Sequence, residues 1–333
     1  MNIPISVLMS VRNGEKHIKK SIESILNQTF DKFEFLIVND GSDDNTLEII
    51  NYYSNLDKRI RIINKKKTGL SNSLNVGIDS ALGDWIARID SDDFCQLDRL
   101  ELQYKLAISK KNIALIGSNI FEVSENEKIS KYFKYPTDSR TLKKNLIKFK
   151  KFFAHSCFFF SRKVAIKIGK YREVFEQSQD LDLCLRISDY GEILSINKPL
   201  LSIRKHNGQM SHEENGLKQL IESRAAVTSY LIKKKGYNDP ITEINPKVSF
   251  LKFYKFIKQE IHINKYDKFY LFVKHLKFNY LNLESNNLLL LLNIIIRSPF
   301  FFLYFLNIRF IGDNYARTLT KKWIKSHIMI NEK

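Results

Sequence analysis

Short apolar runs alternate with segments of helical periodicity along the first part of the chain, and this alternation constrains the fold more than any other feature. The runs occupy residues 5–11, 33–38, 61–63 and 85–89. Between the first two, Ile18, Ile22 and Ile25 recur at the spacing of one helix face. Strands that alternate with helices in this way predict an α/β fold, with a mostly parallel sheet and helices on both of its faces.

Acidic residues follow two of these runs. Residues i and i+2 of an extended segment point to the same side, so Asp90 and Asp92 are expected to converge where the fourth strand ends. Ligands bind at this edge of an open α/β sheet. Two adjacent carboxylates repel each other unless a cation neutralises them, and carboxylate oxygens suit Mg²⁺ or Mn²⁺, which bind phosphates. Asp40 ends the second strand at the same edge, although a turn aspartate in Asn-Asp-Gly is an alternative explanation for it.

A third acidic pair lies at the start of an expected helix near residue 179. Asp180 is in a position to cap that helix, and Asp182 is in a position to interact favourably with its dipole. A functional interpretation makes one of the two a general base. The residues alone leave this choice open.

A set of segments follows in a fixed order along the chain, namely residues 5–14, 24–29, 38–46, 69–78, 85–93, 155–156, 169–171, 179–183 and 204–206. Together these segments resemble glycosyltransferase family 2, which has the GT-A fold. The similarity extends over roughly residues 3–212.

The resemblance implies a role for each acidic residue. Asp40 would contact the uracil, because this family mostly uses UDP-sugars, and Asp90 would contact the ribose or the metal. Asp92 would ligate Mn²⁺ or Mg²⁺ on the diphosphate, and Asp180 matches the acid that the family uses as general base. The other positions implied to bind the nucleotide-sugar are Ser10, Val11, Arg12, Lys67, Gly69, Ser91 and Arg204, and His206 is a further candidate metal ligand.

Two positions depart from the family's usual pattern. Arg12 occupies a position where an aromatic residue usually stacks on the base, and Gln179 replaces a usual Glu beside the base residue. A direct catalytic role for His155 is the weaker interpretation of that residue. The Phe158-Phe159-Phe160 run is expected to be a core strand rather than a sugar-binding platform.

The expected activity is that of an inverting glycosyltransferase. It would move a hexose or N-acetylhexosamine from a UDP-sugar to a hydroxyl of lipopolysaccharide, capsule or a lipid-linked glycan. A sugar-nucleotidyltransferase is an alternative, but the stretch after the first strand lacks the Gly-rich, basic loop that such enzymes need. A non-enzymatic adaptor for membranes or nucleic acid is another alternative, although it leaves Asp40, Asp90, Asp92 and Asp180 without a role.

The C-terminal part of the chain differs in composition from the rest. We expect a catalytic domain over residues 1–225, with nucleotide binding in about 1–95 and the acceptor side in about 96–225, and a helical region over 226–333. Residues 241–333 contain 15 Lys and Arg against 6 Asp and Glu, a net charge of +9 out of +18. Cations interleaved with large apolar residues favour an anionic membrane surface over nucleic acid as the partner, although an ordinary basic surface remains an alternative.

Two apolar runs, residues 288–296 and 300–308, lie in this region, with Arg297 and a proline between them. A spanning helix would bury that arginine in the bilayer, so two interfacial helices or a buried helix pair are the better interpretations. Three scattered cysteines without a Cys-x-x-Cys pair, and a strand-like start without a signal peptide, fit a reducing cytoplasm. The expected location is therefore cytoplasmic and peripheral, on the inner face of the membrane.

Overall fold

The structure is a computed structural model, and it describes residues 3–150, 152–206, 216–241, 246–263 and 316–327. Contacts divide the chain into two compact units. Unit 1 comprises Met1–Leu146 and Lys150–Gln209, and unit 2 comprises Ile147–Phe149 and Met210–Lys333. The domain boundary that we expected near residue 225 falls inside helix α8 (Gly216–Lys234).

Unit 1 is built on one sheet whose first half is parallel. The strand order is β3-β2-β1-β4-β8-β6-β9-β5, and β7 pairs with β6 beside this path. The parallel strands are β1 (Ile5–Val11), β2 (Phe33–Asp40), β3 (Ile60–Lys65) and β4 (Trp85–Asp90). Every residue of β2 is buried, as expected for a parallel strand that is covered on both faces.

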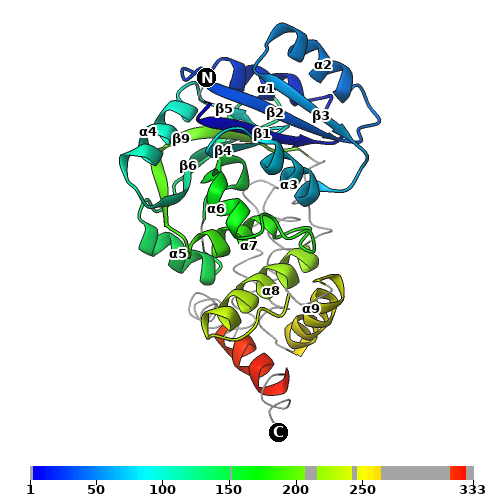
Figure 1. The fold of residues 1–333 in the computed structure, drawn as a ribbon, viewed down its shortest axis with the longest axis vertical. Coiled ribbons are helices and arrows are strands. Elements are labelled where there is room, and N and C mark those ends of the chain that lie inside the picture. The colour runs from blue at the N-terminus through cyan, green and yellow to red at the C-terminus, as the bar shows by residue number, and fades with distance from the viewer. Residues whose placement is uncertain (1–2, 151, 207–215, 242–245, 264–315, 328–333) are drawn as a thin grey trace, which may run out of the picture. The chain divides into compact units, whose positions relative to one another are not determined.

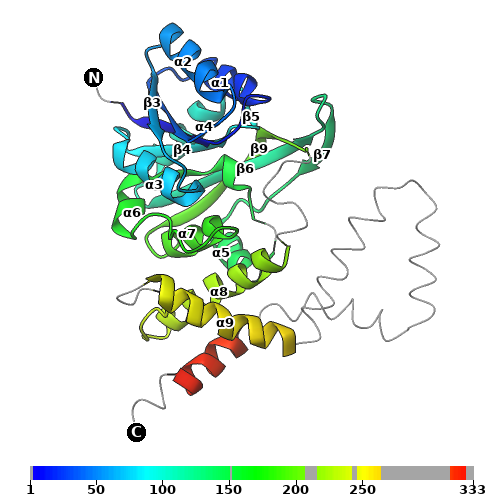
Figure 2. The same cartoon turned by 90° about the vertical axis from the view of Figure 1, so that its right-hand side faces the viewer.

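Three helices connect these parallel strands. They are α1 (Ile18–Leu26), α2 (Thr46–Leu56) and α3 (Leu70–Ser80). Figures 1 and 2 show α1 and α2 on one face of the strands and α3 on the other. Ile18, Ile22 and Ile25 of α1 are fully buried, so the helical spacing in the sequence correctly marked the face that packs on the core. The expected α/β architecture is confirmed in this half.

The second half of the sheet mixes strand directions. Its strands are β5 (Phe94–Cys95), β6 (Ile113–Val123), β7 (Ile129–Phe133), β8 (Phe159–Ser161) and β9 (Glu192–Arg204). Strand β8 lies antiparallel between β4 and β6, whereas β6 and β9 run parallel. Phe159 and Phe160 are fully buried, which places the phenylalanine run in the core.

A proline lies inside strand β9. Strand β9 is continuous through Pro199, and its register with β6 shifts at that point, where Asn119 faces Pro199. A proline cannot donate a ladder hydrogen bond, and a bulge is one of the places in a sheet that tolerates it. The proline therefore bends the strand without ending it.

Shorter helices complete unit 1. They are α4 (Arg99–Ser109), α5 (Ser139–Ile147), the 3-10 turn η1 (His155–Cys157), α6 (Arg162–Lys167) and α7 (Gln179–Ile187). Arg99 at the start of α4 is fully buried, and its guanidinium donates to the carbonyl of Arg88 at 2.7 Å. This bond holds α4 against the C-terminal end of strand β4, next to the expected metal-binding residues.

Unit 2 is helical in the part that the structure describes. It contains α8, α9 (Pro246–Ile263) and a helix over residues 316–327. The apolar runs at 288–296 and 300–308, on which the membrane prediction was based, lie outside the described residues. Among the helices that are described, none combines the length and the apolar character that crossing a bilayer requires.

Candidate active site

The carboxyl ends of the parallel strands bring the predicted nucleotide-binding residues to one edge of the sheet. Ser10 of β1 lies opposite Val38 of β2 on one side and Asp90 of β4 on the other. Asp40 ends β2 two residues beyond Val38. The prediction that Asp40 and Asp90 share one sheet edge is therefore confirmed by the strand register.

A cluster of three carboxylates forms where β4 ends. Asp90, Asp92 and Asp93 each place an oxygen within 4.8 Å of the others. The backbone turns back here, since the amide of Asp93 donates to the carbonyl of Asp90. Oxygen ligands gathered in this way suit Mg²⁺ or Mn²⁺, so the donor set fits the cation that the sequence predicted. Asp93, which we had not assigned to the site, belongs to the cluster.

The proximity of these carboxylates changes their protonation. Burial, together with the charges of Asp92 and Asp90, raises the pKa of Asp93 well above its usual value. Burial also raises the pKa of Asp90, and Asp92 and Asp180 add to that rise. Ionising all of these groups is therefore costly without an additional positive charge. A divalent cation beside them would supply that charge.

Arg88 provides one positive charge within the protein. It lies two residues before Asp90, on the same face of β4, and both of its terminal nitrogens pair with the carboxylate of Asp90. Its side chain is only 3% exposed. Burial lowers the pKa of Arg88, but Asp90, with smaller contributions from Tyr171 and Asp93, raises it by more, so the guanidinium stays charged. Sequence reasoning missed Arg88, although the period of two along a strand was a signal that could have identified it.

The Arg88 pair separates the roles of the two predicted metal ligands. Both oxygens of Asp90 accept from Arg88, whereas an oxygen of Asp92 lies 2.9 Å from Nε2 of His206. A carboxylate and an imidazole nitrogen side by side can both ligate a divalent cation. Asp92 with His206 is therefore better placed than Asp90 to hold the metal.

The acidic pair on helix α7 divides into one structural residue and one residue that lies at the cluster. Asp182 is 1% exposed and forms ion pairs with Arg172 and, at 2.7 Å, with Arg186. Burial raises the pKa of Asp182, but the two arginines lower it by a larger amount, so the net shift is downward. Its oxygens are committed to packing α7 into the fold, which makes it unsuitable as a base.

Asp180 lies beside the carboxylate cluster and has few partners. Its Oδ1 accepts the backbone amide of Leu181 at 2.8 Å. Burial raises the pKa of Asp180, while Arg88 lowers it. Asp180 in turn raises the pKa of Asp90, so the fold brings residues 90 positions apart into electrostatic contact. Of the two acids in the α7 pair, Asp180 is thus the one that lies at the site.

Asp40 organises the loop that follows β3. Its Oδ1 accepts from Nζ of Lys65 at 2.7 Å and from the amide of Thr68 at 2.9 Å, and its Oδ2 accepts from the amide of Gly69 at 2.8 Å. Burial raises the pKa of Asp40, but these hydrogen bonds lower it by more. A carboxylate has about four lone-pair positions, and these donors, together with Thr68 Oγ1 at 3.4 Å from Oδ1, take up most of them. The side chain of Lys67, on the same loop, is exposed.

The loop after β1 contacts the loop after β2 and approaches the turn after β4. Val11 is buried, whereas the side chain of Arg12 is 38% exposed and lies 3.8 Å from Asp43. Asn13 adopts a left-handed conformation, with φ of 55°, and its side chain accepts the amide of Asp43. A side chain at Gly14 would collide with Val11 and touch Ser91. The loop thus presents Arg12 outward while it supports the Asp90–Asp93 turn from behind.

Arg204 supports the same turn from strand β9. Its side chain is 5% exposed, donates to the carbonyls of Asp92 and Glu125, and pairs with Glu127 at 3.0 Å. These contacts hold the Asp92 segment in place. A role for Arg204 in binding the nucleotide-sugar stays a prediction.

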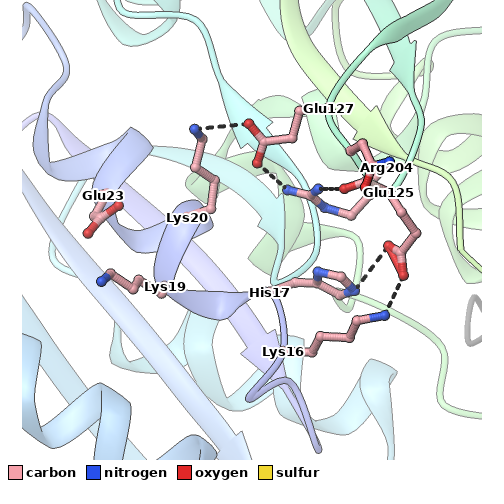
Figure 3. Close-up of a pocket in the computed structure, with 9 residues that line it drawn as sticks. Lys16, His17, Lys19, Lys20, Glu23, Glu125, Glu127 and Arg204 are labelled. Atoms are coloured by element: carbon pink, nitrogen blue, oxygen red, sulfur yellow. Dashed lines mark hydrogen bonds and ion pairs between the residues drawn. The ribbon is translucent and has the colours of Figure 1, made fainter.

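A polar cavity of about 570 Å³ adjoins Arg204 (Figure 3). Glu125 and Glu127, between β6 and β7, reach across it to Lys16, Lys20 and Arg204. The ring centroid of His17, which lines the cavity, lies 4.9 Å from that of His206, the residue beside Asp92. Sequence reasoning missed this ion-pair network, because its partners are far apart in the chain. The remaining lining residues are Lys19, Glu23 and Asn126.

His155 is held inside the fold beside the site. Its Nε2 lies 2.7 Å from the hydroxyl of Tyr171, which is itself buried. Burial, assisted by the charge of Arg88, lowers the pKa of His155 well below its usual value. The following residue, Ser156, accepts the backbone amide of Asp90 through its hydroxyl. The 3-10 turn η1 thus positions the end of β4.

Comparison with known families gives one match that agrees with the sequence resemblance. The family model described as Glycosyl transferase family 2 matches residues 6–169. The O-antigen biosynthesis glycosyltransferase WbnJ of Escherichia coli is 35% identical over 61% of this chain and 80% of its own length. The hyaluronan synthase of Pasteurella multocida is 28% identical over 65% of this chain, but this covers only 22% of that larger enzyme.

Solved structures share the fold. TarS 1–349 of S. aureus in complex with UDP aligns with a TM-score of 0.57 over 97% of this chain and 92% of its own, at 15% identity. The same protein in complex with UDP-GlcNAc aligns with a TM-score of 0.55 over 71% of this chain and 73% of its own. The GT-A fold class that we expected is confirmed by this likeness.

Asp182→Asn tests the division of roles on α7. Removing one charge from this buried ion-pair group leaves Arg172 and Arg186 without their counter-charge, which typically costs about 3–5 kcal/mol. We expect a clear fall in the denaturant midpoint, measured by circular dichroism. Asp180→Asn is the matched control, and it should unfold close to the wild type. Equal midpoints for Asp182→Asn and the wild type would contradict a structural role for Asp182.

Proposed function

Because the chain belongs to glycosyltransferase family 2 and is a glycosyltransferase, we propose that it transfers a hexose or N-acetylhexosamine from a UDP-sugar to a hydroxyl of a surface glycan. The acceptor would be lipopolysaccharide, capsule or a lipid-linked glycan. One observation carries the proposal: Asp90, Asp92 and Asp93 cluster at the carboxyl edge of the sheet, and Asp180 lies close enough for its charge to raise the pKa of Asp90. A donor-binding group and a candidate base thus lie in one place.

Family membership decides between the broad alternatives that the sequence left open. Because the chain belongs to a glycosyltransferase family, the sugar-nucleotidyltransferase and the non-enzymatic adaptor are both rejected. The choice of a UDP-sugar is supported by the solved relatives that hold UDP and UDP-GlcNAc. The choice of a surface-glycan acceptor is supported by the relative whose name assigns it to O-antigen biosynthesis.

The donor side of the site needs a divalent cation in this proposal. Asp92 and His206 would hold Mn²⁺ or Mg²⁺, with Asp93 close by. The bound cation would stabilise the charge that develops on the leaving diphosphate. Asp90, fixed by Arg88, would accept a hydrogen bond from the ribose. Asp40 would contact the uracil through its remaining lone pair, with Ser10, Val11, Arg12, Lys67, Gly69, Ser91 and Arg204 around the nucleotide.

The acceptor side depends on Asp180. As the acceptor oxygen attacks the anomeric carbon, the Asp180 carboxylate would take the proton of that hydroxyl. Burial raises the pKa of Asp180, which makes its carboxylate a stronger base, and the amide of Leu181 and the charge of Arg88 offset only part of that rise. A single displacement inverts the anomeric centre, so an α-linked UDP-sugar would give a β-linked product.

Asp92→Asn is expected to remove metal-dependent transfer while it leaves the fold intact. Loss of a charged ligand weakens stabilisation of the leaving group by several kcal/mol, so UDP release should fall about 100-fold or more. The measurement is UDP release in Mn²⁺ from a panel of UDP-sugars, with mass spectrometry of the product. Asp84→Asn, at the exposed opposite end of β4, is the matched control and should remain active. Near-normal turnover of Asp92→Asn would disprove the ligand assignment.

Asp180→Asn is expected to lower turnover by roughly 10²- to 10⁴-fold with little change in UDP affinity, because a general base acts on the acceptor. Steady-state rates with a soluble acceptor and calorimetric titration with UDP separate the two effects. A parallel loss of UDP affinity would move Asp180 to the donor site and reject its role as base.

A further inference from the structure

One side of helix α9 combines lysines with exposed apolar side chains. Lys247, Lys252, Lys255 and Lys258 are all exposed. Val248 and Leu251 lie among them, with exposed fractions of 62% and 53%. Successive residues of an α-helix are rotated by about 100°, which places all six side chains on one continuous side of the helix. We call this side the α9 basic face.

The opposite side of α9 packs within unit 2. Ser249, Phe253 and Ile257 are buried there. The ring of Phe253 meets that of Trp323 at 4.7 Å, edge to face, and Phe256 lies 5.0 Å from Trp323. Folding of α9 against the helix over residues 316–327 thus uses a different side from the α9 basic face. The four lysines, Val248 and Leu251 are exposed and lie outside this packed side.

The partner helix is basic as well. Ala316, Leu319 and Trp323 are buried, whereas Arg317, Lys321 and Lys325 are exposed. Lys322 pairs with Glu260 of α9 at 2.6 Å. Both helices of this packed pair therefore expose cations.

Acidic residues do not offset this charge in the described part of unit 2. Only three occur there, namely Glu222, Asp239 and Glu260. The first two are buried and the third is half-buried beside Lys322. The described surface of unit 2 is therefore positive, without exposed carboxylates.

We infer that the α9 basic face binds the surface of a bilayer that contains anionic lipid. Lysines are attracted to acidic headgroups, and apolar side chains between them enter the boundary between headgroups and acyl chains. Nucleic acid would attract the lysines but would not bury the exposed valine and leucine, so a membrane is the better partner. The inference deepens the proposed function, because it places the enzyme where a lipid-linked acceptor lies.

The test is sedimentation of the full-length protein with vesicles of phosphatidylcholine, with and without 30% phosphatidylglycerol. The wild type should bind the anionic vesicles only. Lys252→Gln/Lys255→Gln/Lys258→Gln should weaken binding on the order of 100-fold, at about fivefold per lysine near an anionic surface. Leu251→Ser should weaken the binding that persists at high salt, since salt screens only the charged part.

Lys58→Gln/Lys111→Gln/Lys163→Gln is the matched control. It removes the same charge from exposed lysines of unit 1, and it should bind vesicles as the wild type does. Equal weakening by the two triple variants, or an α9 triple variant that binds normally, would overturn the inference. A wild type that binds duplex DNA but no vesicle would also overturn it.

Sugar transfer to a soluble acceptor is measured in parallel as UDP release, and its rate should be unchanged in both triple variants. Vesicle binding without any sugar transfer would refute the proposed function and leave this inference standing.

Discussion

The crowding of carboxylates at the end of strand β4 is the constraint on which the rest of the site depends. Asp90, Asp92 and Asp93 lie within 4.8 Å of one another, and Asp180 adds a fourth negative charge nearby. Within the protein, Arg88 offsets part of this charge through its pair with Asp90. The pKa values of Asp90, Asp93 and Asp180 remain raised, mainly by burial, which shows that the compensation is incomplete. A binding site that is short of positive charge is suited to a divalent cation and the diphosphate it would accompany.

The surrounding fold holds this unfavourable arrangement in place. Buried Arg99 of α4 donates to the carbonyl of Arg88, Ser156 of η1 accepts the amide of Asp90, and Arg204 of β9 donates to the carbonyl of Asp92. Each contact comes from a different element, so the Asp90–Asp93 turn is fixed from several directions. Strain or repulsion at a functional site persists when its surroundings over-determine it. The extensive burial around the turn is thus part of how the site is built.

Much of the first half of the molecule could be predicted from the sequence, because parallel strands with connecting helices leave regular apolar patterns. Those patterns placed Asp40 and Asp90 at one sheet edge, and the strand register agrees. The phenylalanine run of β8 was expected to be a core strand, but its antiparallel position between β4 and β6 was not foreseen, and neither was the bulge at Pro199, because irregular pairing depends on tertiary neighbours. Arg88, His17 and the glutamates at 125 and 127 were missed for a related reason: their partners are set by packing, and a charged residue alone does not reveal them. The choice of Asp180 over Asp182 also needed the structure, which pairs Asp182 with two arginines.

The most direct test of the central claim is the affinity of the wild-type protein for UDP, measured by calorimetry in Mn²⁺ and again in excess EDTA. If the carboxylate cluster accepts a diphosphate only together with a cation, UDP should bind at least about tenfold more tightly with Mn²⁺, a difference of about 1.4 kcal/mol. The same affinity in both buffers would mean that the cluster does not act through a metal, and would contradict the account.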